Sequence, residues 1–219
     1  MCDGIALQSK SGKSTGILHA YRCFAIDAIF SFCFANTMGA LSDPDFRPPI
    51  EVAMELSLPM ITWIKYFPIL KKFIAHCPPA LVTLLRPQLG GLIRMRGMLK
   101  AQVVEVTTHP ETLQKAAHPI IYHELLNPKH GKTVPSLTSL RDEALLLVFA
   151  GSDTTSNTLT LATMHILSNP AVHERLNQEL LQAWPELSAK PRFEAVENLP
   201  YLVSPFGLVI VSHSLTVFV

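Results

Sequence analysis

The sequence has no excess of either charge, and this excludes several kinds of partner. Its 219 residues include 18 basic and 17 acidic side chains, and the charged fraction is only 16%. A surface that binds nucleic acid or an anionic membrane needs a clear basic excess, so no nucleic-acid partner is expected. The apolar fraction of 48% is ordinary. The low charge therefore suggests a surface that is uncharged or covered by further chain.

Paired cysteines are also lacking. The four cysteines, Cys2, Cys23, Cys33 and Cys77, form no CxxC pair and have no zinc-type spacing. A disulfide scaffold needs denser cysteine usage, so we expect buried free thiols in a reducing, intracellular compartment. The amino end has no charged leader followed by an apolar core, so no signal peptide is expected. We expect residues 1–16 to form a polar linker.

Two familiar ligand patterns are incomplete. Ser11–Ser14 reads Ser-Gly-Lys-Ser, as at the end of a phosphate loop, but Leu7 stands where that loop requires glycine. His118, His123 and His130 have a spacing that matches no usual set of metal ligands. The sequence therefore predicts neither a nucleotide site nor a metal ligand.

The most informative stretch that is present runs from Ser139 to Asn169. It begins with a Ser-x-x-Asp pattern typical of a capping box, contains no proline, and stops at Asn169-Pro170. These features predict one helix, roughly 45 Å long. Gly151 and five threonines lower its intrinsic helix propensity, while its flanks are apolar on nearly every face. Tertiary packing must therefore hold this helix in place.

The middle of this helix, Ala150–Thr155, reads Ala-Gly-Ser-Asp-Thr-Thr. Gly151 leaves room for a flat or bulky group against the backbone. Ala150, Gly151, Thr154 and Thr158 share one face, with Leu147 one turn earlier. Asp153 places a carboxylate in an otherwise uncharged segment, which is costly unless it has a partner or a task. A hydroxyl beside a carboxylate, next to a gap, is an arrangement that can deliver protons.

This hexapeptide resembles the central-helix motif [Ala/Gly]-Gly-x-[Asp/Glu]-Thr-[Thr/Ser] of the cytochromes P-450, the haem-thiolate monooxygenases. Residues 167–185 resemble the next helix of that family, and residues 197–202 resemble the approach to the helix after it. The resemblance spans residues 17–202. It implies a mainly α fold, the helical-bundle portion of the cytochrome P-450 fold, built around one long central helix.

The resemblance also implies roles for individual residues. Thr154 would hydrogen-bond dioxygen bound to the haem, and Asp153 would relay protons from solvent. Ala150, Gly151, Thr154 and Thr155 would lie against the haem, and Leu147 and Ala150 would help to form the substrate wall. The implied partners are a small apolar organic substrate and a reductase. The implied location is the endoplasmic reticulum membrane, although we find no clear anchor.

Two features of the family are missing from this chain. The haem-ligating cysteine lies in a Phe-x-x-Gly-x-Arg-x-Cys-x-Gly loop, and none of the four cysteines has these neighbours. The family's Glu-x-x-Arg pair is also absent. We therefore expect a truncated, inactive monooxygenase that does not hold haem, monomeric or prone to aggregation. The alternative is a non-catalytic helical remnant or an unrelated helical binding protein without haem.

The tail at residues 203–219 is rich in β-branched residues and does not resemble the family. It can be read as a marginal membrane span, as an aggregation-prone strand, or as translated sequence without a function.

Other segments yield simpler expectations. Residues 17–38 read as a buried helix that ends at Gly39, with Asp27 arguing against a membrane span and Arg22 assigned a structural role. Pro87 is expected to begin a helix that reaches Thr108.

Two further helices are expected nearer the carboxyl end. One is short and covers residues 119–127. The other follows Pro170, with Val172, Leu176, Leu180 and Trp184 on one apolar stripe and Glu174, Arg175 and Glu179 toward water.

Overall fold

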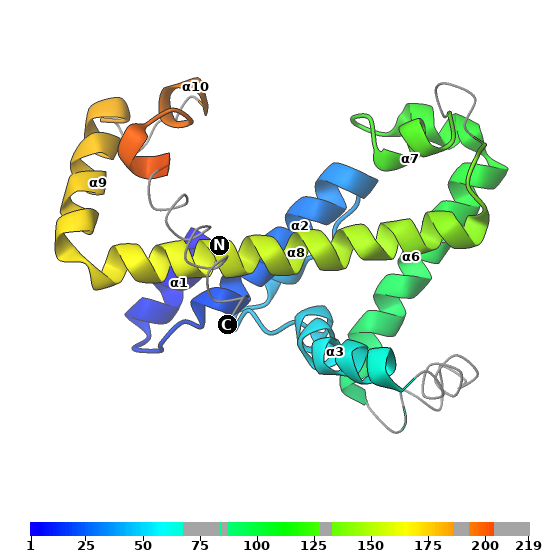
Figure 1. Cartoon of the computed structure of the whole chain (residues 1–219), viewed down its shortest axis with the longest axis horizontal. Coiled ribbons are helices and arrows are strands. Elements are labelled where there is room, and N and C mark those ends of the chain that lie inside the picture. The colour runs from blue at the N-terminus through cyan, green and yellow to red at the C-terminus, as the bar shows by residue number, and fades with distance from the viewer. Residues whose placement is uncertain (68–83, 85–86, 128–132, 186–192, 204–219) are drawn as a thin grey trace. The chain divides into compact units, whose positions relative to one another are not determined.

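The computed structural model describes residues 1–67, 84, 87–127, 133–185 and 193–203 (Figure 1). Within these residues every regular element is a helix, so the predicted mainly α class is confirmed. The chain divides into two compact units, Met1–Thr154 and Thr155–Val219. The division falls inside the longest helix, α8, which covers Leu137–Ser168. The tail expected at residues 203–219 lies, after residue 203, outside the described residues.

Eleven helical elements are assigned in the described residues. In order they are α1 (Cys2–Lys10), α2 (Ile17–Phe34), the 3-10 helix η1 (Ala40–Ser42), α3 (Pro49–Tyr66), η2 (Pro87–Leu89), α6 (Gly90–Thr108), η3 (Pro110–Lys115), α7 (Ile121–Leu125), α8 (Leu137–Ser168), α9 (Pro170–Ala183) and α10 (Phe193–Val196). The helix expected from Pro87 to Thr108 is present as η2 and α6 together. The short helix expected within residues 119–127 is present as α7.

Helix α1 occupies much of the segment for which we expected a polar linker. Gln8 is buried, its amide nitrogen donates to the carbonyl of Pro44 at 2.6 Å, and its amide oxygen accepts from the Thr15 hydroxyl at 2.6 Å. A Cβ on Gly4 would come within 2.8 Å of the Phe46 ring, so this helix packs closely on the loop that precedes α3. This segment is held in place by contacts with residues that are distant in the sequence, such as Pro44 and Phe46. No local sequence pattern predicts such contacts. Only Met1 and residues 11–16 of the expected linker lack helix.

Helix α2 ends earlier than the glycine signal predicted. Ala35 adopts a left-handed conformation with φ 48°, and the N–H groups of Ala35 and Asn36 donate to the carbonyls of Ser31 and Phe30. This pattern of two reverse hydrogen bonds terminates the helix at Phe34, without a glycine at the left-handed position. Gly39, with φ 65°, instead begins the turn into η1.

Asp27 has a structural task in unit 1. Its two carboxylate oxygens accept from the backbone N–H groups of Ala40 and Leu41 at 3.0 and 2.9 Å. These are orphan donors at the start of η1, which the carboxylate caps. Among the helices of the described residues, α2 alone has the length and apolar composition of a membrane span, and 44% of that stretch is buried inside the structure.

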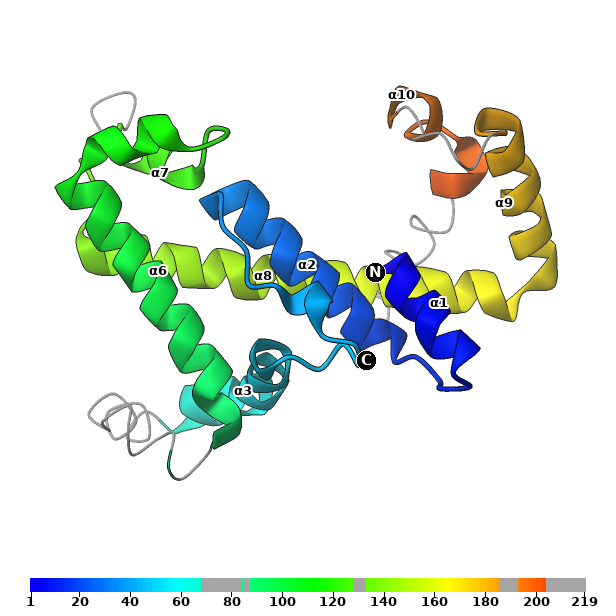
Figure 2. The same cartoon turned by 180° about the vertical axis from the view of Figure 1, so that it is seen from behind.

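Helix α6 packs against the start of α3, as both views show (Figures 1 and 2). The contact is made at Gly91, where any Cβ would collide with the backbone carbonyl of Pro49. A residue without a side chain is therefore required at this crossing. Gly97 lies on the same helix two turns later and has open space where a Cβ would stand.

The core of unit 1 is built mainly from aromatic and branched side chains. Phe34 packs against both Phe30 and Tyr122, with ring centroids 5.5 and 6.0 Å apart. Helix α8 contributes one buried stripe to this core, spaced one turn apart. Its members are Leu140, Ala144 and Val148.

Helix α8 begins two residues before the predicted start. The side-chain oxygen of Ser136 accepts the N–H of Ser139 at 3.2 Å, so Ser136 is the capping residue and Ser139 lies inside the first turn. At the other end, α8 stops at Ser168 and α9 begins at Pro170, as the Asn169-Pro170 signal predicted.

Unit 2 is held together by α9. The stripe expected on this helix is present, with Leu176 buried at its centre. The Glu179 carboxylate does not simply face water, because it accepts the backbone N–H groups of Tyr201 and Leu202 at 3.0 and 2.9 Å. The guanidinium of Arg175 lies 5.0 Å from the centre of the Tyr201 ring. The segment at residues 197–202, which resembled the approach to a family helix, therefore ends in a helical turn capped by Glu179.

Gly91 and Gly97 of α6 give a matched test of this packing. We expect Gly91→Ala to lower the free energy of unfolding by about 1–3 kcal/mol, because the new methyl group must push α3 away. Gly97→Ala should instead raise it by up to about 1 kcal/mol, because alanine favours the helix and meets nothing. Urea unfolding followed by circular dichroism measures both. Equal effects at the two positions would contradict the close approach at Gly91.

Candidate functional site

The hexapeptide Ala150–Thr155 lies at the middle of α8. Ala150 and Thr154 are exposed and lie one turn apart on the same face, with Leu147 half-buried beside them. The Thr154 hydroxyl donates to the carbonyl of Ala150 at 2.7 Å. Thr155 is also exposed, but successive helix residues are about 100° apart, so it does not share that face. The structure thus brings together Leu147, Ala150 and Thr154 and leaves Thr155 outside this group.

Gly151 faces a side chain, which corrects the reason we gave for this glycine. A Cβ at Gly151 would lie 2.6 Å from Cδ1 of Ile29 on α2. The gap that the sequence led us to assign to a flat or bulky group is filled by Ile29, and α8 approaches α2 closely there. The absence of a side chain at Gly151 is explained by helix packing.

Asp153 has a charged partner. Its Oδ1 accepts from Nη2 of Arg22 on α2 at 2.9 Å, and the Asp153 side chain is 26% exposed while that of Arg22 is 6% exposed. An almost buried guanidinium therefore holds a carboxylate that still reaches water. The sequence identified Asp153 but gave Arg22 only a structural role, because a pair separated by more than a hundred residues leaves no local pattern.

Arg22 also contacts a second carboxylate that the sequence did not single out. Its Nη1 donates to Oε1 of Glu51 at 3.1 Å, and the Glu51 side chain is fully buried. The same Oε1 lies 2.8 Å from Nδ1 of His19. Glu51 belongs to the first turn of α3, where an acidic residue reads as an ordinary helix-start preference. One guanidinium thus joins carboxylates from α3 and α8.

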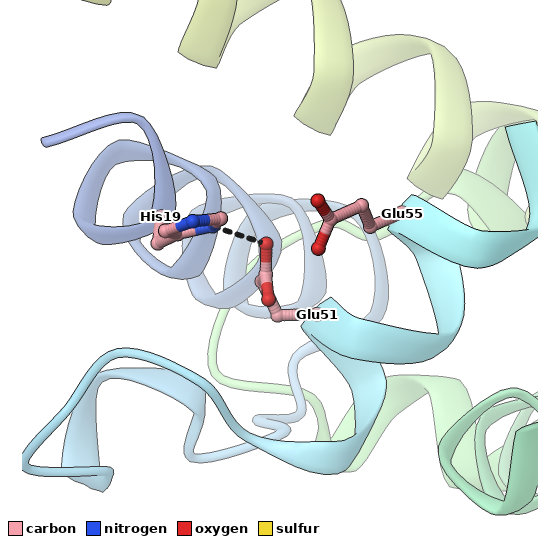
Figure 3. A group of neighbouring side chains, drawn as sticks. All are labelled: His19, Glu51 and Glu55. Atoms are coloured by element: carbon pink, nitrogen blue, oxygen red, sulfur yellow. Dashed lines mark hydrogen bonds and ion pairs between the residues drawn. The ribbon is translucent and has the colours of Figure 1, made fainter. Parts of the chain in front are cut away.

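His19, Glu51 and Glu55 form a cluster that has the spacing of a metal site (Figure 3). Their possible ligand atoms all lie within 4.8 Å of one another. However, Nη1 of Arg47 lies 2.8 Å from Oε2 of Glu55 and 3.5 Å from Oε2 of Glu51. Arginine guanidinium already neutralises these carboxylates, so we interpret the cluster as a network of ion pairs.

Three of the four cysteines lie in the described residues, and all three are free thiols. Burial, reinforced by the nearby carboxylate of Glu51, raises the pKa of Cys23 to about 12. Its thiol donates to the carbonyl of Phe46. Burial also raises the pKa of Cys33. Cys2 is exposed on α1, and Cys77 lies outside the described residues.

The two described histidines of the His118–His130 stretch contact backbone groups. Nε2 of His118 lies 3.0 Å from the carbonyl of Phe32. His123 accepts the N–H of Ile120 and contacts the carbonyl of Leu113 with its other ring nitrogen. His130 is outside the described residues. Both imidazole rings are therefore explained by hydrogen bonds to backbone groups near α7.

A sequence profile of the cytochrome P450 family matches residues 1–204. The chain belongs to the cytochrome P450 family. The match includes α1, so it begins earlier than the residue 17 that we inferred from the sequence. This agrees with the helical structure of the amino end.

Curated relatives carry the same family name. The chain is 32% identical over 196 residues to cytochrome P450 monooxygenase MO6277 of Ascocoryne sarcoides. The matched region covers 84% of this chain and 38% of that protein. It is 29% identical over 204 residues to cytochrome P450 monooxygenase macH of Penicillium terrestre, covering 88% of this chain and 38% of that protein. The chain therefore spans less than half the length of the cytochrome P450 relatives that it matches.

Haem, which the family implies, has to be compared with the residues that are present. Ala150 and Thr154 form a small-residue, exposed face on α8, which fits one side of a flat ring. The thiolate ligand is a different matter, because the raised pKa keeps Cys23 protonated and burial also raises the pKa of Cys33. The exposed face of α8 thus fits one wall of a haem pocket, whereas the buried thiols of Cys23 and Cys33 are poorly suited to be an axial ligand.

The contact between Gly151 and Ile29 can be tested by a double-mutant cycle. Gly151→Ala gains helix propensity but pushes a methyl group against Cδ1 of Ile29, so we expect little net gain or a loss of about 1 kcal/mol. With Ile29→Val the obstructing atom is gone, and the same change should stabilise by up to about 1 kcal/mol. Urea unfolding of the four proteins measures the coupling. An identical effect of Gly151→Ala in both backgrounds would show that the two residues do not touch.

Proposed function

We propose that this chain forms the oxygen-activating part of a haem-dependent monooxygenase, in which Asp153 and Thr154 deliver protons. One observation carries the proposal. An exposed hydroxyl, that of Thr154, follows directly on α8 after a partly exposed carboxylate, that of Asp153, which is bonded to Arg22. Membership of the cytochrome P450 family and the monooxygenase names of the relatives support the same reaction class.

The reaction inserts one oxygen atom of dioxygen into an organic substrate and converts the other to water, which consumes a pair of electrons and a pair of protons. Haem, when bound, supplies the place where dioxygen is reduced. If protons arrive in the wrong order, the same electrons and protons leave as hydrogen peroxide. The protein's task at this place is therefore the timed delivery of protons.

The residues of this chain are suited to that task. Asp153 is 26% exposed, so its carboxylate can take up protons from water. Thr154 follows it directly and carries a hydroxyl that can both accept and donate. In the structure this hydroxyl donates to the carbonyl of Ala150 at 2.7 Å. Passing a proton onward needs only a rotation of the hydroxyl hydrogen away from that carbonyl.

We further propose that Leu147 and Ala150 border the substrate, which is a small apolar organic molecule. The exposed Ala150 and half-buried Leu147 present an apolar surface next to Thr154. Electrons would come from a reductase, and the whole protein would work at the endoplasmic reticulum membrane. These partners and this location rest on the family alone.

A second candidate function is a helical protein that binds no haem. The cysteines favour it, since the thiol of Cys23 is held protonated and hydrogen-bonded. We therefore propose that the chain, as it stands, does not bind haem through a thiolate. The two candidates differ in one measurable property, the ligation of haem.

A haem titration separates them. We expect the purified chain, mixed with haem, reduced and exposed to carbon monoxide, to lack the Soret band of thiolate-ligated haem, because the described cysteines do not supply the ligand. Difference spectroscopy is the measurement, and a full-length cytochrome P450 is the positive control. A thiolate band that disappears in Cys77→Ser or Cys2→Ser would overturn this expectation and identify the ligand.

The role of Thr154 can be tested in a full-length setting. Residues 1–204 replace the matching segment of the Ascocoryne sarcoides monooxygenase, and Thr154→Ala is introduced. We expect the fraction of electrons found in product to fall by about tenfold or more while peroxide rises, because general acid–base catalysis contributes at least this much. Quantifying product and peroxide for each reducing equivalent consumed gives the answer.

Thr160→Ala is the matched control, because the Thr160 hydroxyl makes an equivalent bond to the carbonyl of Ser156, also at 2.7 Å. It should leave the yield unchanged. Undiminished product yield in Thr154→Ala would remove Thr154 from proton delivery.

A further inference from the structure

A series of ion pairs joins three helices of unit 1 and ends at Asp153 of the hexapeptide. Arg22 on α2 donates to Asp153 on α8 at 2.9 Å and to Glu51 on α3 at 3.1 Å. It donates through a different terminal nitrogen in each case. The planar guanidinium fixes the directions of both bonds at once, which an ammonium group cannot do.

Burial makes this arrangement unusual. The Glu51 side chain is 0% exposed and that of Arg22 is 6% exposed, whereas the Asp153 side chain is 26% exposed. Burying two charges costs several kcal/mol of desolvation, which their attraction only partly offsets, so such pairs are weak evidence for stability. A role in fixing geometry explains better why charges lie in this place.

Glu51 has two further basic neighbours. Nδ1 of His19 lies 2.8 Å from Oε1 of Glu51, and Nη1 of Arg47 lies 3.5 Å from its Oε2. Oε1 of Glu51 is therefore fixed by His19 as well as by Arg22, whereas Oε2 is buried with no hydrogen bond and only the Arg47 guanidinium nearby. Glu55, one turn later on α3, contacts Arg47 at 2.8 Å and is not bonded to Arg22.

We propose that Glu51, acting through Arg22, positions the carboxylate of Asp153, so that the placement of α3 sets the geometry of the proton-delivering acid on α8. Arg22 and Glu51 are positioning residues in this scheme, because both act through the Asp153 carboxylate. The inference rests on the proposed function, in which Asp153 relays protons.

The first test uses the 219-residue chain and no cofactor. The chain is labelled with 15N in arginine and with 13C in aspartate carboxyl groups, and NMR spectra are recorded for Glu51→Gln and for the control Glu55→Gln. We expect Glu51→Gln to shift the signals of the Arg22 guanidinium and the Asp153 carboxyl, although residues 51 and 153 are not bonded to each other. Glutamine keeps the size of the side chain and an acceptor oxygen at position 51, and circular dichroism of each variant checks that the helices are retained.

Glu55→Gln should leave both signals in place. The effect of Glu51→Gln on Asp153 should also vanish in an Arg22→Lys background, because lysine has no planar fork with which to bridge two carboxylates. An unchanged Asp153 signal in Glu51→Gln would overturn the inference, as would equal shifts from both glutamine variants. A purely stabilising role of the ion pairs would not make the shift depend on Arg22.

The second test measures product yield per reducing equivalent in the full-length chimera. We expect Arg22→Lys to lower the yield by about tenfold, since small displacements of a catalytic group have effects of this size. Asp153→Asn should lower it at least as much, and the double variant should not be worse than Asp153→Asn alone. If Asp153→Asn leaves the yield intact, the proposed function fails. If Asp153→Asn lowers the yield and Arg22→Lys does not, this inference alone fails.

Discussion

The guanidinium of Arg22 is the constraint on which the candidate site depends. It is nearly buried, and it contacts one carboxylate on α3 and another on α8. Because both contacts come from the same rigid plane, α2, α3 and α8 cannot shift independently without leaving a buried charge unpaired. The hydrophobic core holds the helices together, but apolar contacts are not directional. The ion pairs are directional, and they fix the position of α8 relative to α2 and α3 at the turn that carries the hexapeptide.

The middle of α8 is a poor helix by local propensity, and the structure explains how it is stabilised. The hydroxyls of Thr154 and Thr160 donate to backbone carbonyls one turn earlier, so these polar groups are satisfied within the helix. Gly151 allows close packing on Ile29, and Asp153 is paired with Arg22. Residues that disfavour an isolated helix are accommodated here by tertiary contacts.

Much of the fold was predictable because its signals are local. Helix α8, its stop at Asn169-Pro170, and the start at Pro87 follow from periodicity, capping and proline placement, which a single sequence displays. The hexapeptide was also visible, since its residue types are unusual inside an apolar helix. Helix α1 was missed because Gln8 bonds to Pro44 and Thr15, and the end of α2 was misplaced because Ala35 adopts a conformation expected of glycine. The partners of Asp153 were missed for the same reason, since Arg22 and Glu51 are brought to it only by folding.

The contact at Gly151 has a consequence for how this helix can diverge among descendants of the same gene. The side chains of residues 151 and 29 compete for the same space. Enlarging position 151 stabilises the helix only once position 29 has been shortened, so the order of the two substitutions affects stability. The glycine of the hexapeptide is thus tied to a residue of a neighbouring helix, independently of the chemistry proposed for Thr154.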